Sequence, residues 1–357
     1  MVKRTCLYYE HKKLGAKFTE FSGWEMPVQY SSVIDEHNAV RTNAGVFDTA
    51  HMGTFLVSGD NAEKFLNFVT LGNISGLYDK KARYSMILNK NGGIKDDIIV
   101  YRLSGKFFML VVNAGNLEKD FNWLNEQIID KVKIKNISNE ICLISVQGPR
   151  AVYILQNISK ADIVSMKYFT LAEFKIKNID AKFCKLARTG YTGEDGFEIF
   201  ISKEQVFELW EKLMQFSVTP CGLGCRDTLR LEACMPLHGH EIDECINPIE
   251  AGFQETINWD NDFIGKKQLL SIKNKPLRKL IAFECVAGIA RNASEFFFSG
   301  KKIGYVTSGS FSPTLKKSIG MALVESTCTS NILEVEIRNS MRKINVVSKP
   351  FYKRNKV

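Results

Sequence analysis

Three places in this sequence carry side chains whose types and surroundings could do chemistry. The first is the pair Asp96 and Asp97, within a mostly apolar run at positions 94–101. Because successive side chains of a strand point to opposite faces, at least one of these carboxylates lies beside hydrophobic surface. Burying an unpaired carboxylate is costly and raises its pKa, as in many functional acids and bases. The alternative is a structural aspartate at a strand start that accepts hydrogen bonds from turn amides.

The second place is Glu198, in the apolar run 197–201 directly after a Gly- and Thr-rich loop at 189–196. Glutamate is disfavoured in strands. One interpretation is a carboxylate that binds two adjacent N–H donors of a planar group through parallel hydrogen bonds. An edge strand with one solvated face is the structural alternative.

The third place is Arg226, at the start of a predicted helix over 225–235. A cation there opposes the helix dipole, and such local conflicts often mark functional sites. A surface arginine paired with Asp227 or Glu232 is the structural alternative.

We predict no metal site. Cys221 and Cys225 are close, but no second cysteine or histidine pair completes a zinc-binding pattern. His51, His238 and His240 lack metal-site partners and are interpreted as structural histidines.

Composition and absent motifs exclude several classes of protein. The 357 residues are 45% hydrophobic and 24% charged, which indicates two or three folded domains rather than a disordered or disulfide-stapled chain. The sequence contains no P-loop, no nucleophile elbow and no His-Glu-x-x-His pattern. ATPase, serine hydrolase and zinc protease functions are therefore disfavoured.

Charge and cysteine content bear on partners and compartment. The net charge of +9 favours an anionic partner, but the short basic runs and the lack of zinc-finger or RNA-binding motifs argue against nucleic acid. No apolar run approaches the roughly 20 residues that span a membrane, so we expect no membrane association. Residues 1–15 predict no secretory signal. Nine scattered cysteines indicate reduced thiols, as in a cytoplasm or an organelle matrix.

The elements that must position these side chains can be read from periodicity and turns. Strands at 83–89 and 94–103 flank a turn at 91–93, whose Asn-Gly-Gly sequence suits a hairpin. Helices are predicted at 30–43, ended by Gly45, and at 62–69, 116–129, 151–155, 205–214 and 225–235. After position 277 the pattern contains short strands only, typical of a β-sandwich or barrel. Helices do not alternate regularly with strands, so the fold class is α+β.

Taken together, six segments resemble the folate-dependent aminomethyltransferase (T-protein) family of the glycine cleavage system. They are FSGWEMP at 21–27, VFDTAHMG at 46–53, NGGIKDD at 91–97, RTGYTGEDGFE at 188–198, GLGCRDTLRLE at 222–232 and TSGSFSPT at 307–314. The resemblance extends over almost the whole chain.

The resemblance implies a three-domain cloverleaf of the α+β class with a C-terminal β-barrel or jelly-roll domain. Residues 1–50 and 138–243 would form the first, folate-binding α+β domain. Residues 51–137 and 244–273 would form a second, ferredoxin-like α+β domain, and residues 274–357 the barrel. Tetrahydrofolate would enter a central cavity.

The resemblance also implies an activity. The protein would transfer the one-carbon unit of aminomethyl-lipoyl H-protein to tetrahydrofolate, release ammonia and give 5,10-methylenetetrahydrofolate. From the cysteine usage we expect a cytoplasmic location. Asp97 would be the catalytic carboxylate, Glu198 would hold the pterin edge, and Arg226 would be a second substrate-binding residue. The cavity would also be lined by Met52, Tyr84, Tyr101, Asn113, Tyr168 and Arg188. No metal or redox cofactor is implied.

One departure from the family pattern leaves an alternative function open. Glu255 stands where the family usually has a tryptophan, although Trp259 follows four residues later. Folate-dependent demethylases share the implied fold, so a demethylase is the alternative to the aminomethyltransferase. A non-catalytic folate-binding module is a third alternative, disfavoured because the chain lacks that group's Lys-Gly-Cys signature.

Overall fold

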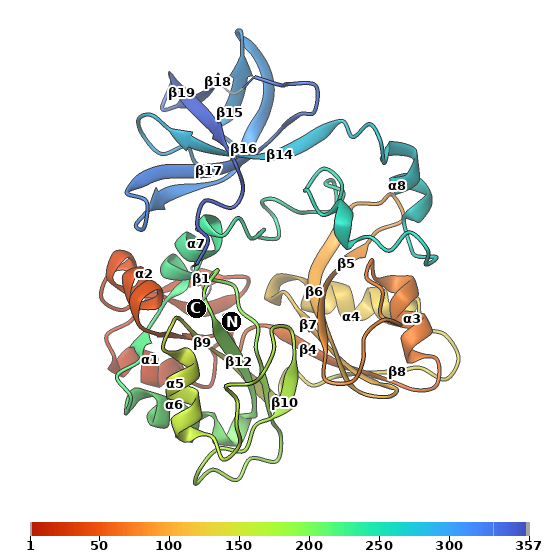
Figure 1. Ribbon diagram of the computed structural model, residues 1–357, viewed down its shortest axis with the longest axis vertical. Helices are drawn as coiled ribbons and strands as arrows, with labels where there is room; N and C mark the ends of the chain where they lie inside the picture. Colours follow the sequence, from red (N-terminus) through yellow and green to blue (C-terminus); the bar gives the residue numbers. More distant parts are fainter. Residues whose placement is uncertain (1, 331, 355–357) are drawn as a thin grey trace. The chain divides into compact units, whose positions relative to one another are not determined.

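The computed structural model describes residues 2–330 and 332–354, which form two compact units (Figure 1). Unit 1 comprises Met1–Leu66, Ile74–Tyr84 and Ile98–Asp227, and unit 2 comprises Asn67–Asn73, Ser85–Asp97 and Thr228–Val357. The outermost residues of the predicted three-domain division, Met1 and Val357, lie outside the described residues. The division itself stays a prediction.

A six-stranded sheet is the centre of unit 1. Its strand order is β10 (Leu171–Glu173), β11 (Cys184–Ala187), β12 (Gly196–Ser202), β9 (Ile141–Gln147), β3 (Gly45–Asp48) and β13 (Thr219–Pro220). Alternate residues of β9 and β12 pack in one buried cluster with helices α5 (Ala151–Ile158) and α6 (Val206–Met214). Because strand side chains alternate, the opposite residues of β9 and β12 point to the other face of the sheet.

A second sheet has the order β5 (Ala82–Leu88), β6 (Ile94–Ser104), β7 (Phe107–Val112), β4 (Gly53–Ser58) and β8 (Lys133–Asn136). Within unit 1, residues of β6 and β7 pack in a buried cluster with Leu143 and Phe200 from the other face of the six-stranded sheet. Strands β5 and β6 continue from one unit into the other. Helices α3 (Ala62–Val69) and α4 (Leu117–Glu126) follow β4 and β7 along the chain, α4 after the turn η1 (Ala114–Asn116).

The N-terminal part of unit 1 contains helix α1 (Tyr8–Lys13), a hairpin of β1 (Lys17–Phe21) and β2 (Trp24–Gln29), and helix α2 (Val33–Thr42). Ser32 caps α2 by accepting a 3.1 Å hydrogen bond from the Asp35 amide. The prediction that Gly45 ends this helix is wrong, because α2 ends at Thr42 and Gly45 begins β3. Gly45 lies so close to Val40 and Cys221 that a Cβ would meet both at 2.5 and 2.6 Å.

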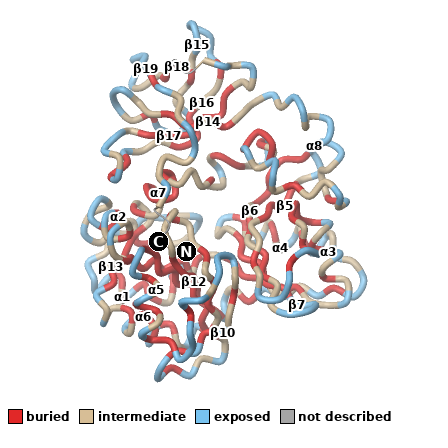
Figure 2. The backbone as a smooth tube through the Cα atoms, viewed as in Figure 1, coloured by how far each residue is buried: buried red, intermediate tan, exposed pale blue. Residues whose placement is uncertain are grey.

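Unit 2 contains a closed six-stranded barrel (Figure 1). Its order is β14 (Arg278–Cys285), β17 (Lys317–Glu325), β16 (Lys301–Ser312), β15 (Glu295–Phe298), β18 (Ile332–Ile337) and β19 (Ser340–Val347). Phe283, Phe296 and aliphatic side chains fill the barrel, so its strands are buried along their inner face (Figure 2). Helix α7 (Leu223–Glu232) leads into unit 2, followed by η3 (Gln254–Thr256) and α8 (Lys266–Ile272).

These elements confirm the predicted α+β class and the C-terminal barrel. Helix α3 has the predicted bounds, and β6 differs from its prediction by one residue. The prediction missed α1, the β1–β2 hairpin, β3, α8 and the short, bulged strand β15. Among the described residues, no helix has the length and apolar character to span a membrane.

Candidate functional site

Glu198 lies in the middle of the six-stranded sheet, on β12 between β9 and β11. The edge-strand alternative is therefore wrong. Glu198 is paired in register with Ser145 on β9 and Ala187 on β11, whose small side chains leave room for the carboxylate. It shares its face with Phe200, and the ring centres of Phe200 and Tyr101 are 5.5 Å apart. The residue is only 8% exposed.

Two hydroxyl groups surround the Glu198 carboxylate. The Thr189 hydroxyl donates to Glu198 Oε2 at 2.5 Å, and the Tyr101 and Thr189 oxygens are 3.3 Å apart. Burial raises the pKa of Glu198, while Thr189, the charge of Arg226 and Tyr101 oppose that shift. Burial, with the Glu198 charge, also raises the pKa of Tyr101 well above its usual value. A carboxylate offers about four acceptor positions, so these two hydroxyls leave capacity for further donors.

The loop at 189–196 is held by Gln147, at the end of β9. Gln147 Nε2 donates to the Ser145 hydroxyl at 3.0 Å and to the Thr189 carbonyl at 3.1 Å. Its Oε1 accepts from the Thr192 hydroxyl at 3.0 Å. A Cβ at Gly190 would lie 2.0 Å from Gln147 Oε1, so the loop can wrap this side chain only with glycine there. Gln147 thereby positions Thr189, the partner of Glu198.

Arg41 is a second anchor of this loop. Its guanidinium donates to the Thr192 carbonyl and to Glu194 Oε1, both at 2.8 Å. Sequence reasoning missed Arg41 and Gln147 as site residues. Both residues lie outside the six segments that resemble the family, so the sequence carried no signal for them.

Arg226 lies in the first turn of α7, with its guanidinium 4.6 Å from the centre of the Tyr191 ring. The side chain is partly buried against an aromatic ring, which does not favour the alternative of a surface arginine. Burial lowers the pKa of Arg226, and Tyr191 and Glu198 oppose this. The guanidinium stays charged and keeps N–H donors for a ligand.

His51 is a further buried group beside these residues. It is 2% exposed, and its Nδ1 has no hydrogen-bonding partner in the described part of the chain. Burial and the charge of Arg226 lower the pKa of His51 to about 4, against a smaller opposing effect of Asp48. The imidazole is therefore neutral near pH 7 and can accept or donate one hydrogen bond at Nδ1.

The turn that carries His51 and Met52 is fixed by Asp48. Its Oδ2 lies 2.8 Å from His11 Nε2, and its Oδ1 accepts from the Ala50 amide at 2.9 Å. The Thr49 hydroxyl donates to the Leu143 carbonyl at 2.9 Å. These buried contacts give the turn one defined conformation.

Arg188 and Tyr168 lie together, and Arg188 also contacts Asp195. Arg188 forms a two-pronged ion pair with Asp195, through Nη2 at 2.6 Å and Nε at 3.1 Å. Its Nη1 donates to the Val164 and Met166 carbonyls. Its guanidinium is 5.0 Å from the ring of Tyr168, which is 43% exposed. Their predicted place in the cavity lining stays a prediction.

The remaining predicted lining residues of unit 1 are half-buried or buried. Met52 packs against the cluster that contains buried Tyr101. Tyr84 is half-buried on β5, and Asn113 is half-buried at the N-terminal end of η1. The structure therefore groups Met52 and Tyr101 in one cluster and Tyr101 with Glu198.

Asp97 belongs to unit 2, on β6 next to Asp96. Asp96 is buried, as are Ile98 and Val100 on the same face, whereas Asp97 is half-buried. The expectation that at least one of the two carboxylates lies beside hydrophobic surface is thus met by Asp96.

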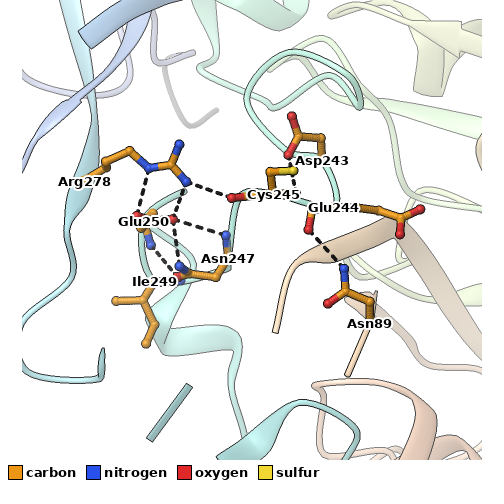
Figure 3. Close-up of polar contacts among 8 residues, drawn as sticks. All are labelled: Asn89, Asp243, Glu244, Cys245, Asn247, Ile249, Glu250 and Arg278. Carbon is orange, nitrogen blue, oxygen red and sulfur yellow. Dashed lines mark hydrogen bonds and ion pairs between the residues drawn. The ribbon is translucent and has the colours of Figure 1, made fainter. Parts of the chain in front are cut away.

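The start of β6 is held by a loop at 243–250 from the region before the barrel (Figure 3). The Ile94 amide donates to the Asp243 and Ile246 carbonyls at 2.9 and 3.0 Å. The Asn89 amide group donates to the Glu244 carbonyl at 3.0 Å. A Cβ at Gly93 would lie 1.9 Å from that same carbonyl oxygen, so glycine is required for this close approach.

The other end of this loop is tied to β14 (Figure 3). Arg278 donates through Nε and Nη2 to the two oxygens of Glu250 at 3.0 and 2.9 Å, and through Nη2 to the Cys245 carbonyl at 2.8 Å. Asn247 Nδ2 donates to Glu250 at 2.7 Å. Glu250 raises the pKa of Arg278, which stays charged. We call residues 243–250 with Arg278 the hairpin clamp.

One group of possible metal ligands occurs among the described residues: Glu36, Cys221 and Cys225, with ligand atoms within 4.8 Å of one another. The Glu36 carboxylate already accepts from the Tyr30 and Gly222 amides at 2.6 and 2.8 Å. Burial raises the pKa of the Cys221 thiol well above its usual value. Metal binding needs a thiolate, so this group is better explained as structural.

The unit 1 residues suit a flat, polar ligand. Glu198 offers buried acceptors, Arg226 offers donors, and His51 offers a buried nitrogen without a partner. The edge of a reduced pterin presents adjacent N–H donors beside a carbonyl group, which matches this donor and acceptor set. Tyr101, Tyr191 and Met52 supply aromatic and sulfur-containing surface for a ring.

Comparison with known proteins agrees with this chemistry. The family model described as the GCVT N-terminal domain matches residues 7–261, and that of the glycine cleavage T-protein C-terminal barrel domain matches residues 278–353. An aminomethyltransferase of Geobacillus sp. (strain WCH70) is 44% identical over 100% of both chains. One of Caldanaerobacter subterraneus subsp. tengcongensis is 46% identical over 99% of this chain and 97% of its own. The crystal structure of glycine cleavage system aminomethyltransferase T from Bartonella henselae matches with a TM-score of 0.93 and 33% identity, covering 99% of each chain.

Proposed function

Because the chain belongs to the aminomethyltransferase (T-protein) family of the glycine cleavage system, we propose how its own residues carry out that family's reaction. The protein is an aminomethyltransferase with tetrahydrofolate as co-substrate. Tetrahydrofolate, when bound, supplies the nitrogen atoms that accept the one-carbon unit. The observation that carries the assignment of the folate-binding residues is the buried Glu198 carboxylate with its two hydroxyl partners.

Glu198 binds the pterin edge in this proposal. Its carboxylate accepts two adjacent N–H donors, which is the strong, two-pronged kind of hydrogen bonding. Thr189 and Tyr101 fix the orientation of the carboxylate, and Gln147 fixes Thr189. Because Glu198 is buried, an N–H donor of the wrong geometry leaves a buried charge unpaired, and this provides specificity.

Arg226 and His51 complete the binding groups on this side. Arg226, held against the Tyr191 ring, donates to an oxygen of the bound substrate. Neutral His51 uses Nδ1 for one further hydrogen bond. Neither residue transfers a proton in this proposal.

Asp97 is the proposed catalytic carboxylate. An ionised carboxylate near the reacting atoms accepts a proton or stabilises a developing positive charge. The hairpin clamp positions the strand residues directly before Asp97, because it bonds the Ile94 amide and contacts Lys95 through Glu244. We therefore propose Arg278, Glu250 and Gly93 as positioning residues.

The proposed donor of the aminomethyl group is the lipoylated H-protein, which is also the proposed partner. A net charge of +9 supports binding of an acidic carrier protein and of the carboxylate tail of folate. We further propose a cytoplasmic location. Its support is that the nine cysteines are scattered and odd in number, as expected for reduced thiols rather than a disulfide framework.

The test is a reconstituted reaction with purified protein, tetrahydrofolate and H-protein that carries the aminomethyl-lipoyl group. We expect release of ammonia and formation of 5,10-methylenetetrahydrofolate, both dependent on H-protein. Absence of ammonia release from correctly folded protein would contradict the proposal. Methyl transfer from a methylated amine without H-protein would instead support the demethylase alternative. Glu255, whose sequence position raised that alternative, is exposed on η3 and adds no structural argument for it.

A further inference from the structure

Unit 1 contains a pair of thiols that the aminomethyl transfer does not use. The Cys142 thiol donates a hydrogen bond to Cys6 Sγ, with the two sulfur atoms 3.7 Å apart. Cys142 is buried near the start of β9, whereas Cys6 is half-buried in the turn before α1. The two cysteines therefore differ in burial, and Cys6 is the one nearer to solvent.

The surroundings of Cys6 favour its thiolate form. The hydrogen bond from Cys142 and the charge of Lys203 lower the pKa of Cys6 to about 7, against burial and the negative charge of Asp48. The same interaction raises the pKa of Cys142, which keeps its proton. Near neutral pH a large fraction of Cys6 is therefore a nucleophilic thiolate, beside a protonated thiol that can react in a second step.

We propose that Cys6 and Cys142 are a redox-active pair that hydrogen peroxide or another hydroperoxide converts to a disulfide. A second cysteine pair shows why this site is distinct. Cys221 and Cys225 also interact through their thiols, but both are buried and burial raises the pKa of Cys221. Cys245 is exposed but lies in unit 2 and has no thiol neighbour among the pairs that the structure describes.

The chemistry balances in two steps. The Cys6 thiolate attacks one peroxide oxygen, giving a sulfenic acid at Cys6 and releasing hydroxide or alkoxide. The Cys142 sulfur then attacks the Cys6 sulfur, forming the disulfide and releasing water, with the Cys142 proton going to the leaving oxygen. Peroxide is reduced by two electrons and the thiol pair is oxidised by two.

The second step requires the sulfur atoms to approach from 3.7 Å to about 2.05 Å, the length of a disulfide bond. The movement falls on Cys6, which lies in a turn outside any helix or strand. Cys142 is held in the ladder between β9 and β12, where it opposes Ile201 in register. An attacking residue in a turn and a resolving residue in a sheet suit a reversible disulfide.

The experiment treats the full-length protein with hydrogen peroxide near pH 7, blocks remaining thiols after denaturation, and identifies peptides by mass spectrometry. We expect a linked peptide that joins Cys6 to Cys142 and disappears on reduction, while Cys221 and Cys225 are recovered as free thiols. Disulfides of Cys6 with any other cysteine, or an oxidised Cys245 beside a reduced Cys6, would overturn the proposal.

Variants separate the two steps. Cys6→Ser abolishes the linked peptide, and the matched control Cys245→Ser leaves it unchanged. Cys142→Ala removes the hydrogen bond that lowers the Cys6 pKa, so oxidation of Cys6 should be slower. The Cys6 sulfenic acid that does form lacks its resolving thiol and should gain a second oxygen atom as sulfinic acid.

A second measurement holds even if Cys142→Ala folds poorly. The rate at which iodoacetamide modifies Cys6 in the wild type should be half-maximal near pH 7, since its pKa is about 7. A midpoint at or above about 8.5, the value of an ordinary thiol, would contradict the proposed reactivity. None of these readouts depends on the aminomethyltransferase assignment.

Discussion

Glu198 and Asp97 each lie on a strand of an antiparallel pair, but the chain positions the two carboxylates by different means. Glu198 is held by side chains, chiefly Thr189, which is nine residues away and directly bonded to it. The strand that carries Asp97 is held at its start through backbone groups, by carbonyls of a loop about 150 positions later in the chain. The first arrangement tunes the chemistry of one carboxylate. The second fixes where a strand begins, and with it the side chain that follows.

This comparison predicts that removing either carboxylate has a different effect on the enzyme. Loss of Glu198 should alter binding and its dependence on pH, since the local side chains set its hydrogen bonds and its pKa. Loss of Asp97 should alter turnover, and the same defect should appear in weaker form when the clamp is damaged far from Asp97.

The largest effect is expected for Asp97→Asn. Removing a positioned acid or base lowers the rate by about 10²–10⁴-fold. The measurement is kcat for ammonia release with aminomethyl-loaded H-protein, together with KM for tetrahydrofolate. We expect kcat to fall and KM to change little. Turnover within twofold of the wild type would remove Asp97 from the mechanism, and Asp79→Asn, on an exposed residue, is the control.

The second effect is expected for Glu198→Gln. Replacing the charge weakens hydrogen bonds to the ligand by about 1.5–3 kcal/mol, or roughly 10–150-fold in affinity. We expect KM for tetrahydrofolate to rise by this factor while kcat at saturation falls much less. Thr189→Val should show a smaller rise, since it removes only the hydroxyl that orients the carboxylate. An unchanged KM in Glu198→Gln would contradict the proposed binding role.

A third prediction concerns the hairpin clamp and connects the two kinds of positioning. Arg278→Gln leaves the buried Glu250 without its ion pair, and Gly93→Ala forces a Cβ against the Glu244 carbonyl. Each should lower the free energy of unfolding by about 1–3 kcal/mol. Each should also reduce kcat, by less than Asp97→Asn does, with little change in KM.

Because both substitutions disturb one loop, their effects on kcat should not add. Residues in one network show coupling energies of about 0.5–3 kcal/mol in double-mutant cycles. Arg278→Lys should restore part of the kcat, and Lys317→Gln, which breaks an exposed ion pair of the same barrel, should change nothing. Strictly additive losses in kcat would show that the two substitutions act only through stability.

The sequence predicted much of this arrangement where the signal was local. Helix α3 has the predicted bounds because its apolar residues repeat with helical spacing. Glu198 was recognised because a charge in an apolar strand is unusual. Gln147 was not, because a neutral amide before a Gly-Pro turn gives no such signal, although it fixes the loop beside Glu198.

The hairpin clamp could not be predicted for a different reason. Its bonds to β6 run through backbone carbonyls, which any residue type supplies, and they join segments far apart in sequence. Gly93 was assigned to a turn, yet its φ is not in the left-handed region and its role is close approach to Glu244. The short elements α1 and β15 were missed because six and four residues are too few to show a period.

The smallest effect is expected in the pH dependence set by Glu198. Burial raises the pKa of Glu198 above 4.5, its value in the unfolded chain. Between these two pKa values the folded protein keeps a proton that the unfolded chain has released. This contribution to stability is present below pH 4.5 and is lost as the pH rises through the folded pKa. Binding of tetrahydrofolate needs the ionised carboxylate and should therefore strengthen over the same range.

Arg226 provides the means to sharpen this prediction, because its charge holds the pKa of Glu198 down. Arg226→Gln should move the midpoint of the KM–pH profile to higher pH, whatever its effect on KM itself, whereas Glu198→Gln should flatten the profile. Lys317→Gln removes a barrel cation that is not among the groups acting on Glu198, and should leave the midpoint in place. A midpoint unmoved by Arg226→Gln would mean that the charge of Arg226 does not reach the carboxylate, and that hydroxyl contacts alone set its protonation.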